Sequence, residues 1–147
     1  MRGGIGQNFC VLSLALLALL QAAPRGAEAD TMGGEDRRLA AGDWGGKHVR
    51  MEVSDGGALL EFDCAKGSIA RPVTLDAEGS FSAAGDFARE GFGPRDEDAV
   101  PKRMPALYSG SVKEESMTLT VTLTETKEEV GVFTLARGSR GRIWKCH

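Results

Sequence analysis

The polar residues best placed to do chemistry lie on two neighbouring segments of the chain and are His48, Arg50, Glu61 and Asp63. If these segments form a hairpin, the four side chains share one face, because side chains alternate along a strand. An imidazole beside two carboxylates can bind a metal ion or exchange protons with a substrate. The same set can instead form a solvated charge ladder worth about 0.2–1 kcal/mol per pair, and we favour this interpretation.

A metal site would need a third ligand, and the chain has one other histidine, His147. It follows Cys146, so a disulfide from Cys146 to Cys64 would bring it near Asp63. The candidate zinc ligands are therefore His48, Asp63 and His147, which would make the protein a metal-dependent enzyme.

Other catalytic signatures are missing from the sequence. There is no G-x-S-x-G serine and no P-loop. We therefore expect no catalytic residues, no cofactor and a non-enzymatic function.

The elements that would position these residues begin with a hairpin over residues 48–64. Asp55-Gly56 lies between two alternating apolar runs, which is a strong signal for a tight turn. One register puts all the apolar residues on one face, and a shift by one residue would mix them with charged partners. The apolar pairs in this register are Val53 with Ala58, Met51 with Leu60, and Val49 with Phe62.

Residues 1–29 have the three parts of a secretory signal: a positive start, an apolar run over 9–20 and the small-x-small site Ala27-Glu28-Ala29. Asp30 is the preferred mature start, and cleavage after Ala22 or Ala23 is the alternative. The apolar run is short for a membrane span of about 20 residues. We expect a secreted or periplasmic protein without a stable membrane anchor after cleavage, with an uncleaved anchor as the other possibility.

The charge and cysteine content of the chain after residue 29 indicate its class of partner and its cross-linking. Of the chain's 18 basic and 21 acidic residues, 16 and 20 remain after residue 29, and no basic stripe marks a nucleic-acid partner. Two cysteines also remain, Cys64 and Cys146, and an even count in an exported chain indicates a disulfide. Two separate buried thiols are the alternative. We predict a flexible leader over 30–41 and one domain over 42–147.

The rest of the chain consists of short alternating runs separated by turns, without a convincing helix. A two-residue tip at Glu114-Glu115 pairs Val112 with Met117, Gly110 with Leu119, and Tyr108 with Val121. The segment 129–137 changes face partway, which predicts a β-bulge. With the two hairpin strands, the predicted strands cover 68–75, 80–89, 106–112, 116–124, 129–137 and 142–146.

About eight short strands with local turns predict an all-β fold. We favour a small antiparallel up-and-down barrel in which the last strand closes on the first, because closure removes exposed edges. A β-sandwich is the alternative.

A binding function would use the inner face and the long segment 90–105, whose length and glycine and proline content are typical of a functional or disordered loop. Small inward residues would let a ligand come close. Trp44 can be a core plug or a ligand platform. The candidate ligand-binding residues are Trp44, Ala83, Gly85, Phe87 and Tyr108.

The motif Gly42-Asp43-Trp44 resembles the G-x-W of lipocalins and related barrels. The resemblance implies a barrel in which a late arginine, Arg140 or Arg142, packs on Trp44. Longer segments are similar to a group of uncharacterised exported bacterial proteins, which implies no known activity. These segments are WGGKHVRMEV, EFDCAKG, YSGSV and MTLTVTLTETKEEVGVFTLARG.

Together these patterns predict a secreted or periplasmic, non-enzymatic binding module for a small apolar ligand or a partner protein. Small exported barrels that inhibit lysozymes or metalloproteases share its size, signal and single disulfide. An inhibitor of a secreted hydrolase is therefore an alternative by analogy, and a metal-dependent enzyme is the other.

Overall fold

A computed structural model describes residues 37–91 and 100–146. The predicted signal over 1–29, the centre of the 90–105 loop and His147 lie outside these residues. The described part is built of strands, and no helix in it is long and apolar enough to cross a membrane.

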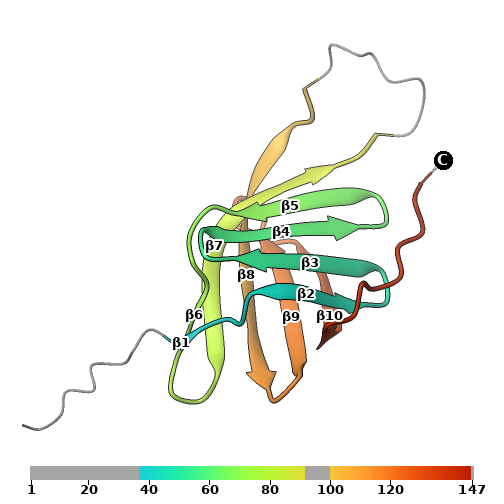
Figure 1. Cartoon of the computed structure of the whole chain (residues 1–147). Helices are drawn as coiled ribbons and strands as arrows, with labels where there is room; N and C mark the ends of the chain where they lie inside the picture. Colours follow the sequence, from blue (N-terminus) through green and yellow to red (C-terminus); the bar gives the residue numbers. More distant parts are fainter. Residues whose placement is uncertain (1–36, 92–99, 147) are drawn as a thin grey trace, which may run out of the picture. The chain divides into compact units, whose positions relative to one another are not determined.

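Eight antiparallel strands close a barrel in the order β10-β2-β3-β4-β5-β7-β8-β9 (Figure 1). The predicted all-β barrel is therefore confirmed. A separate two-stranded sheet pairs β1 (Arg37–Arg38) with β6 (Thr74–Leu75). The barrel strands are β2 (Gly42–Gly46), β3 (Val49–Ser54), β4 (Gly57–Phe62), β5 (Ala65–Ile69), β7 (Ser80–Arg89), β8 (Arg103–Lys113), β9 (Ser116–Leu123) and β10 (Glu129–Arg137).

Two hairpins have the predicted register. In β3–β4, Val53 lies opposite Ala58 and Val49 opposite Phe62, with the apolar residues inside. In β8–β9, Tyr108 lies opposite Val121. The pairing of β10 with β9 shifts between Glu129 and Gly131, which confirms the bulge.

The strand that closes the barrel differs from the prediction. Residues 42–46 form β2, which pairs with both β3 and β10. Residues 142–146 form no strand, and their one ladder contact is a parallel bridge between Lys47 and Arg142. The glycines of segment 42–46 leave its backbone bare, which suits a crowded place in the sheet.

The third predicted strand, 68–75, is also corrected. It begins three residues earlier than predicted, because the turn is Asp63–Cys64 and β5 starts at once with Ala65 opposite Phe62. The chain leaves the barrel before Pro72, which cannot donate to a ladder, and resumes as β6.

The folded part begins before residue 42, contrary to the predicted leader over 30–41. The backbone N–H of Leu39 donates to the carbonyl of Val73 (2.8 Å), and both side chains are buried in the core. The indole N–H of Trp44 donates to the carbonyl of Ala40 (3.0 Å). The end of the leader is therefore part of the domain.

Side chains fill the barrel. The ring of Phe62 packs against those of Phe87 and Phe133, with centroids 5.6 and 5.2 Å away. The hydroxyl of Tyr108 donates to the carbonyl of Asp86 (2.7 Å), and burial raises the pKa of this phenol above its ordinary value. The largest fully buried side chains are Trp44, Tyr108, Phe87, Met51, Met117, Leu119, Leu135, Val49 and Val121.

The contact between Gly67 and Tyr108 gives a test of this packing. A Cβ on Gly67 would lie 2.1 Å from the Tyr108 hydroxyl oxygen, so we expect Gly67→Ala to destabilise the barrel. Tyr108→Phe removes that oxygen and should cost about 1–3 kcal/mol, because the Asp86 carbonyl loses its partner.

In the double variant the closest contact is removed, although the ring carbon that carried the hydroxyl would still lie 3.1 Å from the new Cβ. The loss of unfolding free energy in the double variant should therefore be smaller than the sum of the two single losses, as measured by urea unfolding. Simple additivity would contradict the packing described.

Candidate functional site

The five residues predicted to bind a ligand lie in or beside the packed core. Trp44, Phe87 and Tyr108 are 1%, 2% and 0% exposed. Ala83 lies opposite Tyr108, and a Cβ on Gly85 would be 2.9 Å from the Tyr108 ring. Two hollows lie on the outside of the described part, and none of these five residues lines either of them, so their ligand role stays a prediction.

The arginine expected on Trp44 is found elsewhere. The guanidinium carbon of Arg142 lies 5.9 Å from the ring centre of Trp144, in the segment after β10. Within the described residues neither Arg140 nor Arg142 stacks on the ring of Trp44. This detail of the lipocalin resemblance therefore gains no support.

The structure brings together two of the three predicted metal ligands. Nδ1 of His48 lies 2.5 Å from Oδ2 of Asp63. His147 lies outside the described residues, within which no group of three or more histidine, cysteine or acidic residues could hold a metal ion. The zinc site stays a prediction.

Asp63 fastens the end of the chain to the barrel. Its second carboxylate oxygen accepts the backbone N–H of Trp144 (2.8 Å), and its carbonyl accepts that of Cys146 (3.4 Å). His48 has a φ of 67°, in the left-handed region, and its ring packs on Trp144 at 4.6 Å between centroids. These contacts give His48 and Asp63 a structural role.

The predicted disulfide is confirmed, because Cys64 and Cys146 are bonded with Cα atoms 5.3 Å apart. Beside it, Nζ of Lys145 lies 2.6 Å from a carboxylate oxygen of Glu61 and 3.7 Å from one of Glu90. We call residues 138–146 the tail, and these bonds fix its end to β4 and the β4–β5 turn.

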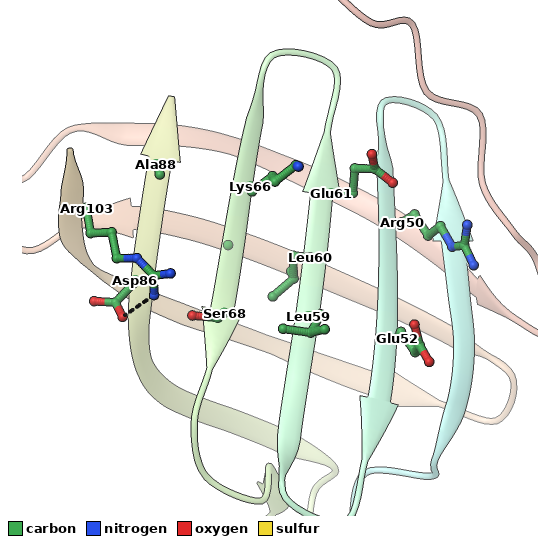
Figure 2. A pocket seen from close by; sticks show the side chains of 11 residues that line it. Arg50, Glu52, Leu59, Leu60, Glu61, Lys66, Ser68, Asp86, Ala88 and Arg103 are labelled. Atoms are coloured by element: carbon green, nitrogen blue, oxygen red, sulfur yellow. Dashed lines mark ion pairs between the residues drawn. The ribbon is translucent and has the colours of Figure 1, made fainter. Parts of the chain in front are cut away.

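The outer face of β3, β4, β5, β7 and β8 carries a hollow of about 650 Å³ (Figure 2). Leu59, which is 64% exposed, lies near its centre, between Glu52 on β3 and Ser68 on β5. We call this the Leu59 hollow. The other residues that line it are Arg50, Leu60, Glu61, Lys66, Gly67, Asp86, Ala88 and Arg103.

Ion pairs hold the rim of the Leu59 hollow. Arg103 pairs with Asp86 (3.8 Å), as the dashed line in Figure 2 marks, and Lys66 pairs with Glu90 (3.4 Å). Glu52 is exposed and makes no ion pair with any other described residue. The hollow thus combines an apolar centre, a braced charged rim and one free carboxylate.

Sequence reasoning missed this hollow, although one signal for it was available. In Ala58-Leu59-Leu60-Glu61, alternation places Leu60 inside, so the adjacent Leu59 must face out. An exposed leucine alone needs no explanation, and only the pairing of five strands shows that it lies in a hollow.

Comparison of the chain with family models, curated proteins and solved structures found no match. The sequence resemblances to lipocalins and to exported bacterial proteins therefore gain no support, and only the eight-stranded barrel that they imply is confirmed.

The pair of Lys145 with Glu61 gives a test of the tail's attachment. The hydrogen bond from Lys145 lowers the pKa of Glu61 below 4.5, and the same bond raises the pKa of Lys145 above 10.5. The pair therefore stabilises the fold between about pH 4.5 and pH 10.5. This contribution is lost as the pH falls through the folded pKa of Glu61 or rises through that of Lys145.

We expect Lys145→Gln to lower the free energy of unfolding at pH 7 by at most about 1 kcal/mol, since both side chains are partly exposed. The difference from wild type should shrink as the pH falls below 4.5, because Glu61 then becomes protonated. Lys113→Gln, which removes a lysine from the end of β8 that makes no ion pair in the described part, is the control. A loss for Lys145→Gln that stays the same from pH 3 to pH 7 would count against the pair.

Proposed function

We propose that this protein is an exported, non-enzymatic binding module that holds a partner protein on the Leu59 hollow. The observation that carries the proposal is the exposed leucine, Leu59, at the centre of a ring of charged side chains. An apolar centre inside a polar rim is the usual anatomy of a protein interface.

A partner protein is favoured over a small apolar ligand because the interior is packed and the hollow opens on the outside of the sheet. Most charged side chains on the rim of the hollow are already in ion pairs, so a partner can cover them at little desolvation cost. They can then exclude water from Leu59 at the centre. The free carboxylate of Glu52 adds a requirement. The partner should present an apolar side chain to Leu59 and a lysine or arginine to Glu52.

Export is supported by the signal-like residues 1–29 and by the Cys64–Cys146 disulfide, which is typical of oxidising compartments. A non-enzymatic role is supported by the missing nucleophile motifs in the sequence. An inhibitor of a secreted hydrolase is the narrower form of this proposal, in which the partner is an enzyme.

The test compares three baits in affinity capture from the medium or periplasm of the source cells: wild type, Leu59→Asp and Val132→Asp. Val132 is 56% exposed on β10, outside the hollow, so its variant is a matched control. Any captured protein is then purified and its Kd measured. We expect Leu59→Asp to weaken binding about 10-fold or more, and Val132→Asp to leave it unchanged.

Glu52→Lys should weaken the same complex because it opposes the partner's basic residue. A partner that binds all of these variants equally well would contradict the proposal.

A further inference from the structure

A second hollow lies where the tail meets the β2–β3 turn. The backbone N–H of Arg142 donates to the carbonyl of Gly46, and that of His48 donates to the carbonyl of Arg142, both at 2.8 Å. This parallel bridge sets Lys47 and Arg142 opposite each other. The hollow is about 690 Å³ and is lined by Gly46, Lys47, Ser139, Gly141, Arg142 and Trp144. We call it the Lys47–Arg142 hollow.

The two cations on this hollow are not balanced by acidic groups. Like charges directly opposite each other on paired strands are destabilising. Neither Lys47 nor Arg142 has a carboxylate within ion-pair distance among the described residues. Of the other 13 lysines and arginines in the described part, six make ion pairs and seven do not. What sets Lys47 and Arg142 apart is that both line one hollow.

The backbone that carries these cations is held firmly. Trp144 lies beside the Arg142 guanidinium, packs on His48 and donates its backbone N–H to Asp63. Gly141 donates its backbone N–H to the Ser139 hydroxyl oxygen (3.2 Å), which leaves the hydroxyl hydrogen of Ser139 free to donate. These contacts therefore fix the backbone positions of both Lys47 and Arg142 at the edge of the hollow.

We propose that the Lys47–Arg142 hollow binds an oxyanion, a phosphate or sulfate group, between the Lys47 ammonium and the Arg142 guanidinium. Arginine matches such a group with two parallel N–H donors, lysine adds a point charge, and the Ser139 hydroxyl adds a third donor. The hollow has room for more than a free ion, so the group would be carried on a larger molecule. This site is separate from the Leu59 hollow and does not depend on the proposed function.

The test is a titration of the full, disulfide-bonded protein with sodium phosphate, at constant ionic strength, followed by ¹H–¹⁵N NMR. We expect saturable shifts at the amides of residues 46–48 and 139–144. Lys47→Gln with Arg142→Gln should weaken binding about 10-fold or more. Lys113→Gln with Arg71→Gln removes the same charge from exposed positions outside the hollow, and should change the Kd by less than about 2-fold.

No saturable shift in wild type, or an equal loss in the control variant, would overturn the proposal. A second measurement is independent of affinity. At low ionic strength and without phosphate, Lys47→Gln should have a higher denaturation midpoint than wild type, because it removes the repulsion between Lys47 and Arg142. With phosphate present, wild type should have the higher midpoint, because it binds the ion more tightly. A midpoint that falls in low salt would also overturn it.

Glycerol 3-phosphate distinguishes the sources of the group. If glycerol 3-phosphate binds more tightly than inorganic phosphate, the natural ligand is an oxyanion carried on a larger molecule. Equal binding overturns that part and leaves the free ion as the ligand.

Discussion

Closure of the barrel depends on two positions without side chains, Gly45 and Gly46. A Cβ on Gly46 would lie 1.9 Å from the carbonyl oxygen of Thr134 in β10, and one on Gly45 would lie 2.1 Å from the backbone nitrogen of Gly141 in the tail. Both contacts are with backbone, which cannot move aside cheaply. A larger residue at Gly46 would push β2 away from β10 and leave the sheet with two open edges, and one at Gly45 would push the tail off β2.

The tail lies against the barrel because of the same constraint. With no side chains between them, the tail and β2 come close enough for Arg142 to donate to Gly46 and accept from His48. The Cys64–Cys146 disulfide and the contacts of Asp63 then fix the far end. Closure of the sheet and placement of the tail are therefore two results of one local property of the sequence.

Features that depend on neighbours in sequence could be predicted. The β3–β4 register follows from the Asp55-Gly56 turn and the apolar alternation, and that of β8–β9 follows in the same way. The pairing of β2 with β10 could not be predicted, because it joins distant segments and glycines carry no alternation signal. The tail has apolar residues at strand-like spacing, but crowding and its bonds to Asp63 hold it as an irregular segment.

The candidate sites were harder to predict than the fold for a related reason. Inward residues such as Tyr108 were candidates for a ligand because small neighbours left room for one, but Tyr108 itself takes that room by reaching Asp86. The sequence predicts that Leu59 is exposed, but it does not predict the hollow around it, because residues of five strands form that hollow. His48 and Asp63 were correctly paired, yet their partner is Trp144 of the tail, which the hairpin alone does not reveal.

The tail has one more consequence, which concerns the order of events in a newly made chain. Arg142 and Trp144 lie in the tail, which the disulfide at Cys146 joins to the barrel. Lys47 lies in the turn between β2 and β3, near the start of the barrel. In a chain whose thiols are still reduced, the segment that carries Arg142 has hydrogen bonds and an ion pair to the barrel but no covalent link. Oxidation adds that link, and so ties the full stability of the charged hollow to arrival in a compartment where cysteines are joined.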